Sequence, residues 1–140
     1  MRGLATLWEV DKFQLESSFQ TQHWIYTKLQ HLSSKLNIEL FNLYVPVLYA
    51  EKEQYWQTLI DFLEAYSLNN IIIARYFNLI LAPKEKRGGT SSKDCFIPFV
   101  ENLIQQWGLM DFKPKKGLYT WTNNRIGEEH ISARLDRFLL

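Results

Sequence analysis

Residues 71–78 read Ile-Ile-Ile-Ala-Arg-Tyr-Phe-Asn, and the first four form an unbroken apolar run dominated by β-branched side chains. A run of this kind, without alternating polar residues, is typical of a strand buried on both faces of a sheet. Asn69 and Asn70 interrupt the chain just before it. We therefore expect a central strand at residues 71–74.

Helical periodicity appears on both sides of this strand. Residues 51–66 and 96–107 each place their apolar side chains at helical spacing. Glu51 and Glu53 fall in the first turn of the earlier segment, where the helix dipole favours anions. Pro98 suits the first turn of the later one, and Gly108 suits its C-terminal stop. The sequence predicts two helices that flank the central strand along the chain.

Strand patterns fill the rest of the chain. We expect strands at residues 3–8, 13–19, 23–29 and 38–44, the last ended by Pro46, which cannot donate to a strand ladder. Two more are expected at residues 118–123 and 133–140, joined by a polar turn that contains Gly127. Strands outnumber helices, which predicts an α+β domain with sheets packed together and helices outside.

Composition fits one folded domain. The chain has 140 residues, of which 46% are hydrophobic and 15% aromatic, enough for a packed core. Residues 1–83 carry 6 Lys or Arg against 8 Asp or Glu, and residues 84–140 carry 10 against 7, so the second part has a net charge of +3. This is a mild basic bias, far short of a strongly basic nucleic-acid-binding domain.

The location of the protein is also constrained by sequence. Cys95 is the only cysteine, so no internal disulfide can form. The apolar stretch at residues 4–8 is too short for a signal peptide, and no run approaches the length of a membrane span. We expect a soluble intracellular protein, in the nucleus or the cytoplasm, with no membrane partner.

Several segments, in order, resemble one family. The endonuclease/exonuclease/phosphatase domain of plant LINE-type retrotransposons carries similar motifs at similar separations, and the resemblance covers essentially the whole chain. The matching segments are Gly3-Leu-Ala-Thr-Leu-Trp8, Asn42-Leu-Tyr-Val-Pro46, Ile72-Ile-Ala-Arg-Tyr-Phe-Asn78, Tyr119-Thr-Trp-Thr-Asn123 and Ala133-Arg-Leu-Asp-Arg-Phe-Leu139.

The resemblance implies a fold and an activity. The fold is a truncated four-layer α/β/β/α sandwich of the DNase I-like type, with two sheets face to face and helices on both outer sides. Active members cut phosphodiester bonds with a divalent cation, usually magnesium. Their domain also includes an upstream metal-binding glutamate and a downstream Ser-Asp-His segment. The resemblance therefore implies that residues 1–140 are a single partial domain lacking both.

The resemblance also implies a damaged site. Tyr76 stands where the family has the aspartate that handles the proton of the nucleophile, and Arg75 stands where it has glycine. A phenol with an ordinary pKa of about 10 is a poor water-activating base and a weak metal ligand. Arginine adds bulk and positive charge where the family has a small residue. We predict an inactive enzyme that holds no metal.

Three positions match catalytic residues of the family. Tyr44 matches a tyrosine that reaches the scissile phosphate, and its alternative role is a strand aromatic that caps the core. Asn78 matches an asparagine that helps to hold phosphate or water, and its alternative role is to close the turn after the strand. Asp136 matches the aspartate that orients a catalytic histidine.

No histidine lies in the context that this role of Asp136 requires. His23, His31 and His130 all fall outside a Ser-Asp-His segment, and we interpret them as ordinary surface or strand residues. Asp136 is then expected to pair with Arg134 or Arg137, or to face solvent.

Basic and aromatic residues near the end of the chain are candidates for contact with DNA. The alternatives are a solvated loop for the cations and a core position for the tryptophan. Lys113, Lys115 and Lys116 are interpreted as a polar turn before a strand. The candidates are Lys84, Arg87, Trp121 and Arg134.

Four functions remain open from sequence. The leading hypothesis is a degenerate, inactive endonuclease fragment. A non-catalytic nucleic-acid-binding module that binds DNA weakly, a protein-interaction or purely structural remnant, and an active magnesium-dependent endonuclease are the alternatives. The sequence does not decide the oligomeric state.

Overall fold

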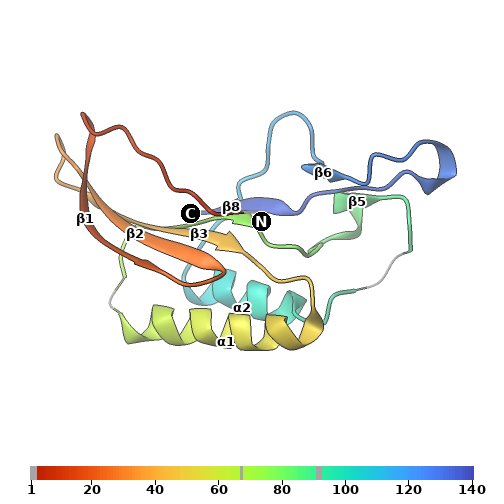
Figure 1. Ribbon diagram of the computed structural model, residues 1–140, viewed down its shortest axis with the longest axis horizontal. Helices are drawn as coiled ribbons and strands as arrows, with labels where there is room; N and C mark the ends of the chain where they lie inside the picture. The colour runs from red at the N-terminus through yellow and green to blue at the C-terminus, as the bar shows by residue number, and fades with distance from the viewer. Residues whose placement is uncertain (1–2, 67, 91–92) are drawn as a thin grey trace.

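The computed structural model describes residues 3–66, 68–90 and 93–140. Its centre is a five-stranded sheet in the order β1-β2-β3-β4-β8 (Figure 1). The β3–β4 pair is parallel and the other pairs are antiparallel. A parallel pair needs a crossover connection, and the helix α1 supplies it. The strands are β1 (Phe13–Gln20), β2 (Trp24–His31), β3 (Asn37–Tyr44), β4 (Ile71–Tyr76) and β8 (Asp136–Leu139).

Two helices cover one face of this sheet. α1 (Tyr49–Ala65) and α2 (Ile97–Gln106) both lie on the same side of it in Figure 1. They share one core with the side chains of β2, β3 and β4 that point toward them, including Trp24, Phe41 and Ile73. Trp56 and Leu59 of α1 are fully buried there, and so is Val100 of α2. Burial of these apolar side chains is what fixes the helices on the sheet.

The main elements predicted from periodicity are confirmed. The strands expected at residues 13–19, 23–29, 38–44 and 71–74 and both helices appear within a few residues of the predicted bounds. Gly108 has a φ of +61° just past α2, the left-handed conformation that ends many helices. Ile71 and Ile73 of β4 are buried in the core beneath the helices, and Ala74 is buried too, whereas Ile72 on the helix-free face is half-buried, so burial on both faces is only partial.

A small second sheet lies beyond the larger one. Its order is β5-β7-β6, with β5 (Lys86–Arg87), β6 (Trp121–Thr122) and β7 (Ser132–Ala133). Short 3-10 turns, η1 (Pro83–Glu85) and η2 (Gly127–Glu129), precede β5 and β7. The strand expected at residues 118–123 is therefore only two residues long, and that expected at 133–140 is divided into β7 and β8. The chain passes from the small sheet into the large one between β7 and β8.

The expected strand at residues 3–8 is wrong. This segment pairs with no strand, and β3 and β4 already have a neighbour on each side. It crosses the helix-free face of the sheet instead, where Asn42 Nδ2 donates to the carbonyl oxygen of Ala5 at 2.9 Å and to Thr6 Oγ1 at 3.3 Å. The local apolar pattern predicted a strand, but a strand forms only where a neighbouring strand has a free edge to pair with.

The layers differ in part from the expected sandwich. Over the described residues the helices form one layer on one face, and the small sheet extends the end of the large one (Figure 1). A mixed α/β architecture is thus present. Within residues 3–66, 68–90 and 93–140 no helix is long and apolar enough to cross a membrane.

Candidate functional site

Three candidate residues meet at one end of the sheet. Tyr44, Tyr76 and Asp136 are in register across β3, β4 and β8. They line a cavity of about 280 Å³ together with Arg75 and the N-terminal residues Gly3 and Leu4. The cavity lies at the carboxyl ends of the parallel strands β3 and β4, where ligand sites of mixed sheets commonly occur.

Two phenols line this cavity side by side. The rings of Tyr44 and Tyr76 are stacked, with their centroids 5.1 Å apart and their planes inclined by 15°. Each tyrosine is half-buried, so Tyr44 neither lies in the core nor caps it fully. Stacking holds the two rings against each other at the place where the resemblance expects a carboxylate. The site therefore presents aromatic surface and hydroxyl groups.

Arg75 holds an unusual backbone conformation beside them. Its φ is +94°, in the region that favours glycine, and its side chain is exposed at the cavity. A non-glycine residue in such a conformation is strained by about 1 to 3 kcal/mol. Arg75 lines the cavity at the position where the resemblance expects a glycine.

Asp136 contributes a carboxylate to this cavity, but Arg134 and Arg137, its expected partners, are bonded to other acids. Its backbone N–H donates to Thr120 Oγ1 at 3.0 Å, and its side chain is half-buried. Arg134 and Arg137 make their ion pairs with other acids, so the expected pairing of Asp136 with either is wrong.

Those two arginines belong to a buried ion cluster with Glu85 and Asp111. Arg134 bonds Glu85 Oε1 at 3.0 Å and Asp111 Oδ1 at 2.6 Å. Arg137 bonds Asp111 Oδ2 at 2.8 Å, Glu85 Oε1 at 3.0 Å and Glu85 Oε2 more closely. Both arginines and Glu85 are at most 1% exposed. The cluster is formally neutral, which is how buried charges are tolerated.

Electrostatics within the cluster favour the charged forms. Burial by itself would raise the pKa of Glu85, but the Arg137 guanidinium and the backbone N–H groups of Leu81 and Ala82 outweigh burial and lower it to about 2. Burial would likewise lower the pKa of Arg134, but Asp111 and Glu85 raise it above its ordinary value.

The ion cluster contains one residue that was expected to bind nucleic acid and two residues that were not expected to have a role. Arg134 was expected to contact nucleic acid, but a buried guanidinium that is bonded to two carboxylates is not available to a phosphate. Sequence reasoning missed Glu85 and Asp111. The available signal was a pair of arginines in a closing strand whose other residues are apolar except for Asp136, because two arginines that become buried call for acidic partners.

Asn78 lies away from the cavity, in the turn that follows β4. Its φ is +50°, its Nδ2 donates to the carbonyl oxygen of Pro46 at 3.3 Å, and its own carbonyl accepts from Lys52 Nζ at 3.2 Å. Lys52, which is 6% exposed, also pairs with Asp94 at 2.6 Å. These contacts match the alternative role of Asn78, closing the turn.

The residues present do not fit a magnesium ion. Mg²⁺ is held by carboxylates and other oxygen ligands in an octahedral arrangement. Within the described part of the chain no three His, Cys, Asp or Glu side chains gather as a metal ion requires. Among the described residues that line the cavity, Asp136 is the one carboxylate, and the cationic residue Arg75 lines it too.

The remaining nucleic-acid candidates lie at the surface. Lys84 and Arg87 are exposed in η1 and β5, and Trp121 of β6 is 37% exposed, so it is not a core residue. His130 forms no part of the cavity: its Nδ1 contacts the carbonyl oxygen of Arg125 at 2.8 Å and its Nε2 contacts Ser132 Oγ at 2.7 Å.

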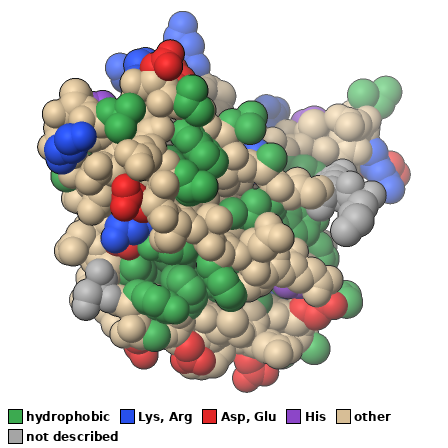
Figure 2. Space-filling view, turned by 60° about the vertical axis from the view of Figure 1, so that its left-hand side comes forward, with side chains coloured by type: hydrophobic (Ala, Val, Ile, Leu, Met, Phe, Trp, Pro, Cys, Tyr) green, Lys and Arg blue, Asp and Glu red, His purple; other side chains and the backbone are tan. Residues whose placement is uncertain are grey.

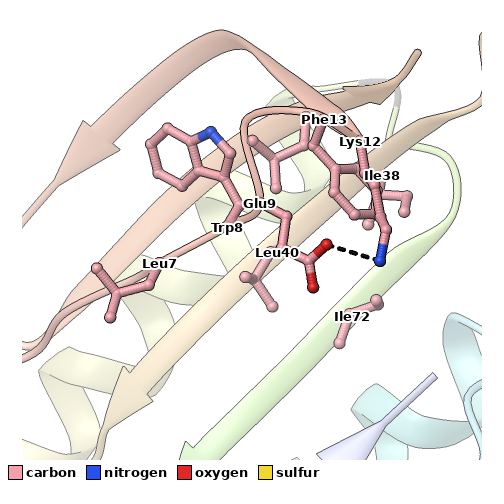
Figure 3. A pocket seen from close by; sticks show the side chains of 9 residues that line it. Leu7, Trp8, Glu9, Lys12, Phe13, Ile38, Leu40 and Ile72 are labelled. Carbon is pink, nitrogen blue, oxygen red and sulfur yellow. Dashed lines mark ion pairs between the residues drawn. The ribbon is translucent and has the colours of Figure 1, made fainter.

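A second hollow lies under the N-terminal segment. It has a volume of about 590 Å³ between Trp8 and the helix-free face of the sheet, which contributes Leu29, Leu40 and Ile72. Figure 3 shows the side chains of Ile38, Leu40 and Ile72 and, among them, the Glu9–Lys12 ion pair. The lining of the hollow is apolar except for Glu9 and Lys12.

The fold and the cavity together define a class: an α+β domain whose mixed sheet carries two helices on one face and a polar cavity at its strand ends. Among solved structures, this chain is similar to the "Endonuclease domain of TRAS1, a telomere-specific non-LTR retrotransposon", with a TM-score of 0.62 and 12% sequence identity. The match covers 91% of this chain and 53% of that chain, so this chain spans about half the length of its neighbour. At this identity the likeness shows a shared fold. No protein-family model and no curated protein matches the sequence.

Proposed function

We propose that this chain is a nuclease-fold domain of the retrotransposon endonuclease type that does not cut phosphodiester bonds. The observation that carries the proposal is Tyr76, which stacks on Tyr44 at the position where the resemblance expects a water-activating carboxylate. The similar fold of a retrotransposon endonuclease domain supports the type.

The chemistry of cleavage explains the expected loss. Hydrolysis of a phosphodiester requires charge neutralisation on the phosphate, activation of water and donors for the developing oxyanion. Removing a general base alone typically costs about 100- to 10,000-fold in rate. The guanidinium of Arg75 supplies positive charge but no base, and Asp136 alone makes a poor metal site.

Incubation of the purified chain with supercoiled plasmid and magnesium tests this proposal. We expect no nicking above a buffer control, with a competent DNase as the positive control. Metal-dependent nicking that the Asp136→Asn variant abolishes would show that the cavity is a working active site and would overturn the proposal.

The alternative of an active magnesium-dependent endonuclease makes a different prediction for Tyr76→Asp. Restoring this carboxylate should not restore nicking, because Asp136 would be the one further carboxylate among the described residues that line the cavity. If the Tyr76→Asp variant nicks plasmid, then Tyr76 alone accounts for the loss of nicking activity, and the remainder of the site is competent.

A non-catalytic nucleic-acid-binding module is the second candidate. Its support is the separation of charge on the surface. The exposed charges of α1 are all acidic (Glu51, Glu53, Asp61 and Glu64), whereas Lys84 of η1 and Arg87 of β5 are exposed near the small sheet, together with the acids Glu128 and Glu129 of η2. Figure 2 shows acidic side chains along the lower border of the molecule, on the helix side, and a mixture of basic and acidic side chains above it. A titration with DNA at several salt concentrations tests this candidate, and absence of binding at low ionic strength rejects it.

The apolar hollow supports the third candidate, a protein-interaction or structural remnant. In the four-layer sandwich of the family a second sheet would pack on the helix-free face, where Leu40 and Ile72 line the hollow. An exposed apolar face of this kind favours association. Light scattering distinguishes the outcomes: oligomers support this candidate, and a monodisperse monomer counts against it.

A further inference from the structure

The chain exposes more surface than a compact protein of its size. Its solvent-exposed area is 9462 Å². The usual scaling of exposed area with mass gives about 7,600 Å² for a folded monomer of 16.7 kDa. The excess of about 1,800 Å² falls within the range of about 1,000 to 2,500 Å² that each chain buries in a permanent homodimer. The chain therefore has surface enough to bury in a stable association.

Strand pairing identifies apolar side chains on the helix-free face of the large sheet. Directly opposed residues project from the same face. Leu15 of β1 pairs with Leu29, which lines the apolar hollow. Phe138 of β8 pairs with Ala74, two residues along β4 from Ile72, which lines the hollow as well. Leu15 is exposed and Phe138 is 56% exposed. Exposed apolar side chains thus lie on this face on both sides of the hollow.

The N-terminal segment adds a projecting side chain to the same surface. This segment lies on the side of the sheet opposite to α1 and α2 (Figure 1). Leu7 lines the hollow of about 590 Å³ and is nevertheless 92% exposed. A twofold symmetric interface brings the same patch of two chains together, so the patch has to be complementary to itself. A projecting leucine beside an apolar hollow meets this requirement.

Charge separates the helix-free face from the helix layer. Two like-charged surfaces repel each other, and the exposed charges of α1 are all acidic. The helix-free side carries both signs: Glu9 and Lys12 pair at 2.6 Å, and the loop of residues 113–118 with its lysines stands there too (Figure 1). The other charged residues on or beside this face are Asp11, Glu16, Arg75 and Asp136. A second copy therefore meets no excess of acids on this side.

We propose that a second copy of this chain binds to the helix-free face, so that the two large sheets pack face to face with their helices outside. This proposal rests on the protein-interaction candidate and names the partner. Sheets that pack in this way interdigitate the side chains of their facing surfaces. Leu7, Leu15 and Phe138 of each chain would become buried, and burial of apolar surface is what stabilises the dimer.

Analytical ultracentrifugation over a series of concentrations tests this proposal. We expect a discrete species of twice the chain mass of 16.7 kDa. Leu7→Glu and Phe138→Glu should each raise the dissociation constant of the dimer by at least about 30-fold, because each places an unpaired carboxylate in the interface of both chains. Leu7 is almost fully exposed, so its replacement should leave the single chain folded, and circular dichroism checks this.

Two exposed apolar residues elsewhere provide matched controls. Ile126, in the loop before η2, is 91% exposed and so matches Leu7 closely. Leu48 is exposed at the start of α1, on the helix side. Ile126→Glu and Leu48→Glu make the same chemical change as the test variants, and both should leave the dissociation constant unchanged.

The outcomes separate this proposal from the candidate on which it rests. A monomer at every concentration overturns the proposal and the protein-interaction candidate together. If a dimer forms but Leu7→Glu and Phe138→Glu dimerise as the unchanged chain does, the chain associates through another surface, and the proposed face is wrong. Open-ended aggregates without a discrete dimer also overturn the proposal. None of these results bears on the expected absence of nicking, which the plasmid assay tests separately.

Discussion

Glu85 is the residue on which the buried arginines of the closing strands depend. It accepts hydrogen bonds from both Arg134 and Arg137, and its side chain is almost completely buried. Its Oε2 also accepts the backbone N–H groups of Leu81 and Ala82, at 3.0 and 3.3 Å. One carboxylate thus joins the turn before β5 to the strand that carries Asp136 into the candidate cavity.

Removing this charge should destabilise the whole domain. In a Glu85→Gln variant two buried guanidinium groups share one remaining carboxylate, which should cost about 3 to 5 kcal/mol of unfolding free energy. Urea denaturation at pH 7 measures the change. Glu128→Gln, in the exposed turn η2, is the control and should change the stability by less than about 0.5 kcal/mol.

The same residue should make stability depend on acid. The pKa of Glu85 falls from an ordinary 4.5 to about 2 in the folded chain, so its stabilising effect is complete above pH 4.5 and is lost as the pH falls toward 2. This shift corresponds to about 3 kcal/mol. The free energies of unfolding of the unchanged chain and of Glu85→Gln should therefore approach each other as the pH falls from 6 to 3. A difference that stays constant over this range would contradict the lowered pKa of Glu85.

At the scale of elements, the contact of β5 with β7 sets the position of the small sheet. Gly88 follows β5 with a φ of +79°, and a Cβ built there would lie 2.1 Å from the backbone oxygen of His130. The close approach of these two backbones is possible because residue 88 has no side chain. The packing of the residues that follow β5 against those that precede β7 therefore requires a glycine at position 88.

Gly88→Ala should destabilise the domain more than a comparable change elsewhere. We expect a loss of at least about 2 kcal/mol, because the strained φ and the backbone clash act together. Gly117→Ala is the matched control, since Gly117 also has a positive φ, +72°, but open space around it, and it should cost about 1 kcal/mol. Thermal or urea unfolding of the two variants gives the comparison, and equal losses would show that the clash relaxes.

At the scale of the whole molecule, charge divides along the layers. The helix layer presents the acids of α1, whose one lysine, Lys52, is buried. The buried ion cluster removes equal numbers of positive and negative groups from the surface, so the excess positive charge of residues 84–140 remains exposed. A nucleic acid would thus be repelled by the helix side and attracted to the small sheet and its lysines.

This arrangement predicts the salt dependence of binding. Replacing Lys113, Lys115 and Lys116 together by glutamine should reduce the slope of log affinity against log salt for a single strand by up to about 2. Lys35→Gln, an exposed lysine in the turn between β2 and β3, should leave the slope unchanged. An equal effect of both changes would mean that binding follows net charge and not a defined surface.

Periodicity predicted the elements of this fold well, for a local reason. The apolar spacing in α1 and α2 and the β-branched run of β4 follow directly from which face of each element is buried. The segment at residues 3–8 was predicted wrongly because strand formation requires a free edge, and β3 and β4 have none to offer. The register that aligns Tyr44, Tyr76 and Asp136 likewise depends on which strands become neighbours.

The sequence alone determined the alternation of strands and helices and the absence of a carboxylate at position 76, because both are properties of single residues and their near neighbours. Tertiary structure decided which charges are hidden and which are open. Arg134 was predicted to lie on the surface, but Glu85 and Asp111, 49 and 23 residues away in sequence, bind it in the interior. Burial of an ion depends on partners that only folding brings together, because a charge leaves water only when an opposite charge is there to replace it.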